Sequence, residues 1–148
     1  MRAVAQRVLS AEVRVEGRVT GSIGRGLLVY AGVERGDGQQ DLDYIASKLT
    51  GLRVFEDNEG KMNLNVLEAG GAILLVSQFT LHGDCRKGRR PSFDKAEETE
   101  RAKELYAELA GRLGDSIEIA TGEFQAHMEV ESINDGPITI LLDSRKLF

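Results

Sequence analysis

The sequence has few of the residues that build disulfide scaffolds and metal sites. Its 148 residues include one cysteine, Cys85, two histidines, two prolines and no tryptophan. A single cysteine cannot form an internal disulfide, which favours a reducing compartment, so we expect the protein to be cytoplasmic. A metal site would need more histidine and cysteine side chains than the chain offers, and we expect none.

Long hydrophobic runs are also missing. No apolar stretch reaches the roughly 18 residues that a membrane-spanning helix needs, and residues 1–7 hold no apolar run that could serve as a signal peptide. The proportions of apolar residues (41%) and charged residues (29%) are ordinary for a globular protein. Together with the length, they predict a single domain over residues 1–148 that folds without a disulfide.

Positive charge is scarce overall and concentrated at one place. The net charge of −5 argues against a protein that coats nucleic acid with its whole surface. Arg86, Lys87, Arg89 and Arg90 form the one local basic cluster. An isolated charge run is usually a solvated loop, and this cluster is also the candidate for any contact with nucleic acid.

Hydrophobic periodicity predicts about eight strands and two helices. Apolar residues recur at helical spacing over residues 42–52 and again over 102–113. The second helix carries the stronger signals, because Asp94 and Glu97 resemble a capping box and Gly114 supplies a stop. Strand patterns occupy residues 4–9, 11–16, 27–31, 53–55, 72–81, 117–120, 124–133 and 138–142. The expected fold is one compact α+β domain with a curved or barrel-like, mainly antiparallel sheet.

No set of side chains indicates a mechanism by its spacing. His82 and Cys85 could form a thiol nucleophile and its base, but an ordinary free cysteine is the simpler interpretation. Strand alternation puts His127 on the face opposite to Phe124 and Met128, so we expect it at solvent or at an interface. The acidic residues are scattered, and no spacing forces two carboxylates together.

Two segments draw attention through their backbone. Ser77-Gln78-Phe79-Thr80 ends a buried strand, and it could form a pocket rim whose backbone N–H groups hold an oxyanion with help from Thr80. The simpler interpretation is a strand that runs into a polar loop.

The other segment, Asn134-Asp135-Gly136-Pro137, lies between two predicted strands. Asp-Gly is a strong hairpin signal and Pro can open the following strand, so a turn is the simplest interpretation. Nothing in the local sequence requires a cis peptide bond there.

These segments also carry a resemblance to a known family. The stretches concerned are RAVAQRV (2–8), GRGLLV (24–29), GKMNL (60–64), SQFTL (77–81), KGRRPSF (87–93) and NDGPIT (134–139). In this order, over nearly the whole chain, they resemble the D-aminoacyl-tRNA deacylase family, also described as D-Tyr-tRNA(Tyr) deacylases. Two positions depart from the family pattern: Ile138 stands for the usual Val, and Gln125 stands for a common Gly. Strand alternation predicts that Gln125 faces away from Phe124, Ala126 and Met128 and leaves the pocket wall intact.

The resemblance implies a homodimer with its pockets at the subunit interface. It implies that the Gly136–Pro137 bond is cis and that its carbonyl oxygens project into the partner's pocket, where they exclude L-aminoacyl groups. Arg7 would hold this loop, and Phe124 and Met128 would receive the terminal adenosine of the aminoacyl-tRNA.

For the reaction, the resemblance implies that Ser77, Gln78, Phe79 and Thr80 line the catalytic site, with backbone amides near Phe79 and Thr80 facing the scissile ester. No cofactor is implied, since an aminoacyl ester is already activated and the neighbouring ribose hydroxyl can assist proton movement. Rigid carbonyl oxygens that leave no room for an L side chain would reject L-aminoacyl groups strongly, and they would also admit achiral glycine. The alternatives are a non-catalytic tRNA-binding module that uses the basic cluster, and a thiol hydrolase that depends on Cys85.

Overall fold

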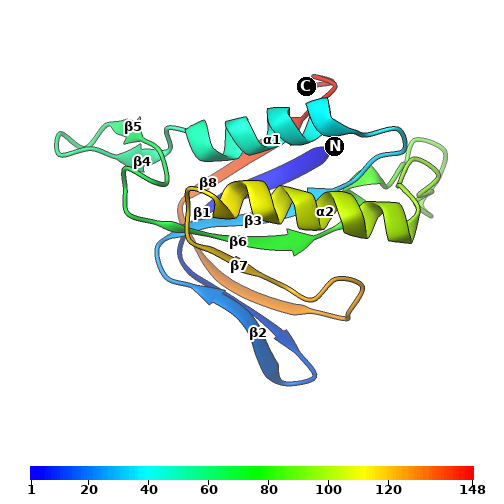
Figure 1. Ribbon diagram of the computed structural model, residues 1–148, viewed down its shortest axis with the longest axis horizontal. Helices are drawn as coiled ribbons and strands as arrows, with labels where there is room; N and C mark the ends of the chain where they lie inside the picture. Colours follow the sequence, from blue (N-terminus) through cyan, green and yellow to red (C-terminus); the bar gives the residue numbers. More distant parts are fainter.

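The computed structural model describes residues Met1 to Phe148, and strands account for most of its regular structure (Figure 1). The elements, in chain order, are β1 (Arg2–Val15), β2 (Arg18–Ile23), β3 (Gly26–Gly32), α1 (Gln39–Gly51), β4 (Phe55–Glu56), β5 (Met62–Leu64), β6 (Ala72–Ser77), the 3-10 helix η1 (Phe79–His82), α2 (Thr99–Gly114), β7 (Ile119–Thr121) and β8 (Glu129–Asp143). The predicted α+β class with two helices is confirmed.

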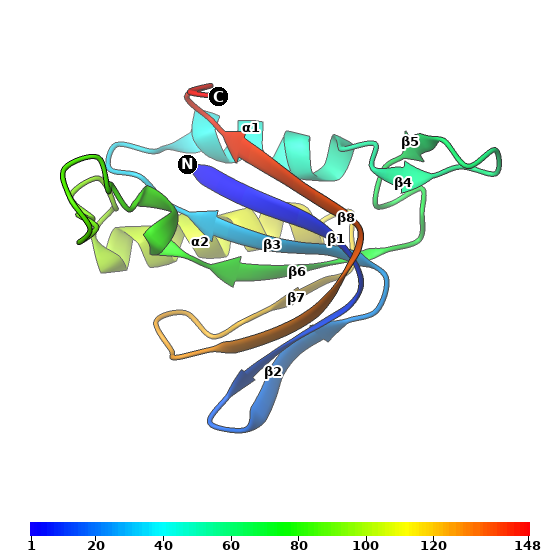
Figure 2. The same cartoon turned by 180° about the vertical axis from the view of Figure 1, so that it is seen from behind.

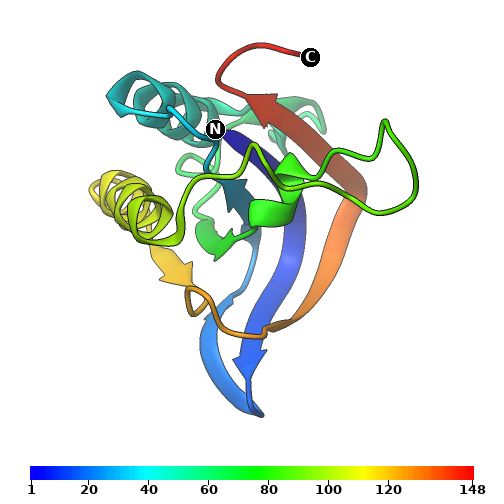
Figure 3. The same cartoon turned by 90° about the vertical axis from the view of Figure 1, so that its right-hand side faces the viewer.

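The main sheet has six strands and mixed pairing. β1 pairs antiparallel with β2, β3 and β8, whereas β3 pairs parallel with β6 and β6 pairs parallel with β7. Parallel pairs need crossover connections, and α1 and α2 supply them. The chain moves in the same direction across the sheet twice, from β3 to β6 and then from β6 to β7. Because both crossovers have the usual right-handed sense, α1 and α2 lie on the same face of the sheet, as Figure 3 shows. The sheet curls into a nearly closed barrel, and β4 and β5 form a separate small hairpin.

Apolar side chains fill the space on both faces of the central strands. In β3, Leu27 and Val29 belong to the core under the helices, whereas Leu28 belongs to a second core inside the curve of the sheet. β6 alternates in the same way, with Ile73 on the helix side and Leu74 inside the curve. Burial on both faces explains why these strands read as continuous apolar runs rather than as alternating patterns.

The first strand is longer than its sequence pattern predicts, and the second was not predicted. The patterns at residues 4–9 and 11–16 belong to one strand, β1, which continues without a break. β2 follows in the glycine-rich stretch, where a side chain on Gly21 would overlap the carbonyl oxygen of Thr121. The strand does contain the strand-forming residues Val19, Thr20 and Ile23, but the glycines at positions 17, 21 and 24 around them are typical turn signals and obscured it.

The predicted capping box at Asp94 and Glu97 is wrong. α2 begins at Thr99, and the residue before it, Glu98, caps no backbone group with its side chain. The Asp94 carboxylate instead accepts a hydrogen bond from the Ser92 hydroxyl at 2.7 Å. Residues 93–97 form a turn and a short bridge to β3's continuation, so the chain enters the helix one turn later than the pattern indicates.

Three more boundaries differ from the sequence patterns. The buried run that starts at residue 72 ends as a strand at Ser77 and continues as η1. The strand expected over 53–55 is confined to β4, and the strand expected over 117–120 begins only at Ile119. Neither α-helix combines the length and the apolar character that crossing a membrane would require.

The closest backbone contact of the sheet generates a stability prediction. A methyl group on Gly26 would overlap the carbonyl oxygen of Ala72 on the paired strand, whereas one on Gly24 would meet nothing within 4 Å. Gly26→Ala should therefore force β3 and β6 apart and lower the free energy of unfolding by about 2 kcal/mol or more. Gly24→Ala is the matched control and should change it by less than about 1 kcal/mol. Urea unfolding of both variants measures this, and equal midpoints would contradict it.

Candidate active site

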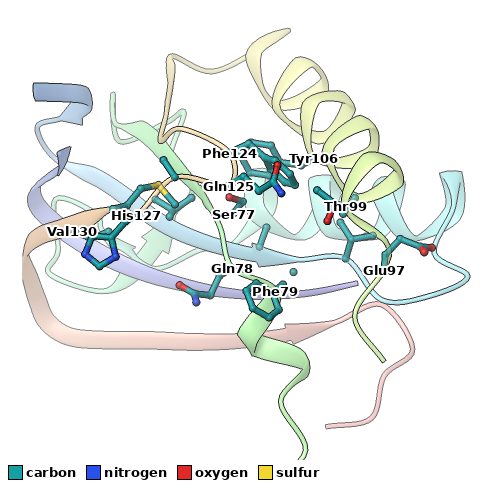
Figure 4. Close-up of a pocket in the computed structure, with 17 residues that line it drawn as sticks. Ser77, Gln78, Phe79, Glu97, Thr99, Tyr106, Phe124, Gln125, His127 and Val130 are labelled. Carbon is teal, nitrogen blue, oxygen red and sulfur yellow. The ribbon is translucent and has the colours of Figure 1, made fainter. Parts of the chain in front are cut away.

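A cleft of about 450 Å³ opens between the end of β6, the start of α2 and the chain that leads into β8 (Figure 4). Its lining residues are Ala31, Gly32, Val33, Val76, Ser77, Gln78, Phe79, Glu97, Thr99, Ala102, Tyr106, Phe124, Gln125, Ala126, His127, Met128 and Val130. Most of these side chains are apolar. A mainly apolar cleft with few polar groups is the usual form of a small-molecule or substrate site.

The inner wall of the cleft is aromatic. The rings of Tyr106 and Phe124 lie 5.7 Å apart between centroids, as Figure 4 shows them side by side. The Tyr106 hydroxyl donates a 2.7 Å hydrogen bond to the carbonyl oxygen of Leu75, and burial raises the pKa of Tyr106 above its ordinary value. Tyr106 is therefore a neutral donor that fixes α2 to β6. Tyr106 lies within the apolar helical pattern of residues 102–113, and its polar hydroxyl was the sequence signal for this role.

The Ser77–Thr80 segment forms one edge of the cleft. Gln78 continues the sheet by donating its backbone N–H to the Ala31 carbonyl oxygen at 2.8 Å, and the chain then turns into η1. Ser77, Gln78 and Phe79 line the cleft, but Thr80 does not, and its hydroxyl is engaged by the Gln78 side-chain amide. The backbone N–H groups of Phe79 and Thr80 open η1 and donate to no acceptor within the protein.

Residues 124–128 form the opposite edge, and they are a turn rather than the strand that alternation predicts. Gln125 has a φ of +68°, a left-handed conformation that glycine adopts without cost, and this explains why Gly is common at this position in the family. Gln125 lines the cleft, so the expectation that it faces away from the pocket is wrong. His127 is exposed, as expected, and it also lies along the cleft. Phe124 and Met128 line the cleft as well. The Met128 sulfur lies so close to Gly122 that a Cβ added at Gly122 would come within 2.6 Å of it.

The Asn134–Pro137 segment is not a hairpin turn. β8 continues through it and stays paired with β1 on both sides, with residues 135–138 opposite the single residue Arg7, so three extra residues form a bulge. The Asn134 side chain closes the bulge, since its amide nitrogen donates to the Thr139 hydroxyl at 3.1 Å and its oxygen accepts from the Ile138 N–H at 3.0 Å. The Gly136–Pro137 bond is cis, and both residues are exposed.

Arg7 anchors the base of this bulge from below. Its buried side chain donates through Nη1 to the Val54 carbonyl oxygen at 2.7 Å, and its Nε lies 3.0 Å from the carboxylate of Asp135 and 3.2 Å from that residue's carbonyl oxygen. One guanidinium thus joins β1, the chain before β4 and the residue that precedes Gly136. A fixed, multidentate arginine is a suitable holder for a loop that must keep its shape.

The bulge and the cleft lie at opposite ends of the same subunit. By register, Arg7 pairs with Leu27 and Leu27 with Ile73, which is four residues before Ser77 on β6. Four residues along a strand and three strand spacings across the sheet amount to a separation on the order of 15–20 Å. Figure 2 shows the bend of β8 at one end of the sheet and the arrowhead of β6 at the other. Within one chain, Gly136 and Pro137 do not meet Ser77, Gln78 or Phe79.

The proposed thiol and base do not form a pair. Cys85 is exposed, whereas His82, the last residue of η1, is buried and has no hydrogen bond from either ring nitrogen. The nearest charge to its Nδ1 is the Glu34 carboxylate at 4.0 Å. Burial lowers the pKa of His82 below its ordinary value, with Arg2 adding to the shift and Glu34 opposing it. No group of three or more His, Cys, Asp or Glu side chains is arranged as metal ligands would be.

Comparison with known proteins identifies the family of this cleft. The profile of the D-Tyr-tRNA(Tyr) deacylase family matches residues 4–143. The chain belongs to this family. A relative from Anaeromyxobacter dehalogenans named D-aminoacyl-tRNA deacylase is 60% identical, and one of the same name from Kosmotoga olearia is 54% identical, each covering the whole of both chains. The resemblance drawn from the six sequence stretches is therefore confirmed.

Two solved structures share the fold of this chain. The c-Myc DNA unwinding element binding protein superposes with a TM-score of 0.92 at 41% identity, covering 97% of this chain and 98% of that one. A probable eukaryotic D-amino acid tRNA deacylase superposes with a TM-score of 0.78 at 18% identity, covering 95% and 97%, and this second likeness shows the shared fold alone.

The buried histidine under the cleft edge generates a pH prediction. Because burial lowers the pKa of His82, the unfolded chain takes up a proton below about pH 6.5 that the folded protein does not. The free energy of unfolding is therefore highest above that pH and decreases as the pH is lowered. The urea midpoint of the wild type should drop between pH 7 and pH 5.5, and His82→Gln should drop less.

His127→Gln is the control for this measurement, since the exposed His127 should contribute little and the variant should follow the wild type. A drop in His82→Gln as large as in the wild type would contradict the assignment.

Proposed function

We propose that the protein is a carboxylic ester hydrolase that cleaves the ester bond of D-aminoacyl-tRNA and releases the free D-amino acid and tRNA. The observation that carries this proposal is the family match over residues 4–143, together with 60% identity over the full chain to a D-aminoacyl-tRNA deacylase. The activity is one of proofreading in translation, and the single, unpaired cysteine fits action in the cytoplasm.

The reaction makes little demand on side chains. An aminoacyl ester on ribose is an activated acyl group, so positioning it beside water and stabilising the oxyanion supply much of the rate. The free N–H groups of Phe79 and Thr80 at the cleft edge are the proposed oxyanion donors. Ser77 and Gln78 orient the ester from the cleft wall, and the neighbouring ribose hydroxyl assists the proton transfer. The Thr80 hydroxyl, held by Gln78 outside the cleft lining, has a structural role.

Chirality is proposed to be read by the partner subunit. Gly136 and Pro137 are exposed, stand out from β8 and are remote from their own cleft, so in this proposal their carbonyl oxygens enter the cleft of a second copy. Rigid carbonyls that receive the amino group leave room for hydrogen in the direction that an L side chain would take, and achiral glycine would be admitted. The exposed Leu9, Ile133 and Leu141 on β1 and β8, beside the unpaired edge of β8, support a homodimer.

The nucleotide end of the substrate is assigned to the other edge of the cleft. Phe124 and Met128 offer an aromatic face and a soft thioether beside it, and base stacking on aromatic side chains is a common means of holding nucleotides. We place the 3′-terminal adenosine there, with Gln125 and His127 at the exposed rim.

A second candidate function is nucleic-acid binding without catalysis. One observation favours it: the relative with a TM-score of 0.92 is named for binding a DNA element. The net charge of −5 counts against this reading, and the cleft has no part in it.

The decisive assay compares D-tyrosyl-tRNA with L-tyrosyl-tRNA. We expect the purified protein to deacylate the D form at least about 100-fold faster, because the filter excludes rather than merely loosens the fit. The rate of release of labelled tyrosine measures this. Equal rates on both substrates, or no hydrolysis of either by folded protein, would contradict the proposal, and tight tRNA binding without hydrolysis would favour the second candidate. Alkylation of Cys85 should leave the rate unchanged.

A pair of variants separates a backbone filter from a side-chain nucleophile. Gly136 has a φ of +127°, which other residues rarely adopt, and an added Cβ would come within 2.8 Å of Ile138. Gly136→Ala should therefore reshape the bulge and lower kcat/KM on D-tyrosyl-tRNA by at least about tenfold. Thr80→Ala should stay within about fivefold of the wild type, since only the backbone of Thr80 is used. Thermal unfolding serves as the folding control, and the reverse order of effects would contradict the assignment.

A further inference from the structure

An exposed basic loop follows the cleft edge directly. Residues 84–92, here called the basic loop, leave η1 and return toward α2, and Asp84 and Ser92 close the base with two backbone hydrogen bonds of 2.8 and 3.0 Å. Every residue from 85 to 92 is exposed. In Figure 3 the loop projects from the end of the molecule, well clear of the sheet and helices. A closed base gives the loop a fixed attachment while its side chains remain in water.

Charge in the basic loop is opposite in sign to that of the rest of the chain. Arg86 is neutralised locally, because its guanidinium lies 2.5 Å from the Asp84 carboxylate and holds the pKa of that carboxyl well below its usual value. Lys87, Arg89 and Arg90 have no carboxylate within salt-bridge distance. Residues 84–95 hold five of the 19 Lys and Arg residues but only two of the 24 Asp and Glu residues. On an acidic protein, such a loop is the place that attracts a polyanion.

The basic loop is physically joined to the cleft. Phe93, just after the loop, packs its ring edge-on against Phe79 with centroids 5.0 Å apart, and Phe79 lines the cleft. At the other side of the cleft mouth, Thr99 begins α2 shortly after the loop ends. From the closed base, four or five residues reach at most about 15 Å. A nucleotide seated in the cleft therefore has its neighbouring phosphates within reach of Lys87, Arg89 and Arg90.

We propose that the basic loop binds the backbone phosphates of the tRNA acceptor arm next to the nucleotide that occupies the cleft. This inference rests on the proposed function and adds the partner surface to it. The cleft reads the acyl group and the terminal adenosine, whereas the basic loop supplies affinity that does not depend on base sequence, as phosphate contacts do. The acidic remainder of the surface repels the rest of the tRNA, so the acceptor arm approaches through this one place.

The test uses two substrates of different size. Wild type and the triple variant Lys87→Gln, Arg89→Gln, Arg90→Gln are assayed on D-tyrosyl-tRNA and on the D-tyrosyl ester of adenosine, which fills the cleft but carries no phosphate. We expect the triple variant to lose about tenfold or more in kcat/KM on the tRNA at near-physiological salt and to match the wild type on the adenosine ester. Binding of uncharged tRNA should weaken with salt less steeply in the variant, the log–log slope falling by about 2 to 3.

The matched control is Lys48→Gln, Lys61→Gln, Lys146→Gln, which removes the same charge from exposed positions on α1, just before β5 and in the C-terminal segment. It should behave as the wild type on both substrates. An unchanged salt slope and unchanged tRNA kinetics in the basic-loop variant would overturn the inference, and so would an equal loss on both substrates or in the control.

If the proposed function were wrong, the wild type would hydrolyse neither substrate. The salt dependence of tRNA binding in the wild type and the triple variant would still decide the role of the basic loop. A loss of duplex DNA binding in the triple variant, with tRNA binding intact, would also overturn the inference.

Discussion

The parallel pairing of β3 with β6 is the constraint on which the other features depend. The two strands approach so closely that Gly26 at one end leaves no room for a side chain beside Ala72. At the other end, a Cβ on Gly32 would come within 2.7 Å of the Gln78 carbonyl oxygen. Between these points both faces of the pair are buried, one under the helices and one inside the curve of the sheet. The pairing therefore fixes both cores at once.

The same pairing also positions the edge of the cleft. The last ladder bond, from the Gln78 N–H to the Ala31 carbonyl oxygen, carries the sheet one residue beyond Ser77 before η1 begins. Phe79 is thus held by the end of a buried strand and not by a loose loop. This rigidity matters for a site that relies on backbone groups, because preorganised donors stabilise developing charge without having to move.

Local periodicity was enough to predict some elements and not others. The apolar stripes of α1 and α2 and the continuous runs of β3 and β6 are properties of neighbouring residues, and the predictions there were correct in kind. β2 was missed because Gly17, Gly21 and Gly24 are typical turn signals in the sequence; only the folded protein shows that Gly21 lies against the backbone of Thr121. The Asp-Gly pair favoured a hairpin, but pairing of β8 with β1 on both sides overrode it. At Gln125 a left-handed turn replaced the expected strand. The positive φ of this residue, which the sequence does not reveal, explains why the family commonly has Gly at this position.

The position of the bulge within the subunit makes the strongest physical case for a second copy. Two of the sequence stretches that carry the resemblance, around Ser77 and around Gly136, stand at opposite ends of a rigid sheet, and no plausible bending of a paired sheet brings them together. The bulge is closed by Asn134 and held by Arg7, yet Gly136 and Pro137 at its tip are exposed. In the proposed function, this exposed tip serves the cleft of a second copy. In a two-fold dimer that brings the β1–β8 faces together, each bulge would meet the partner, and both copies would gain the same contact by symmetry.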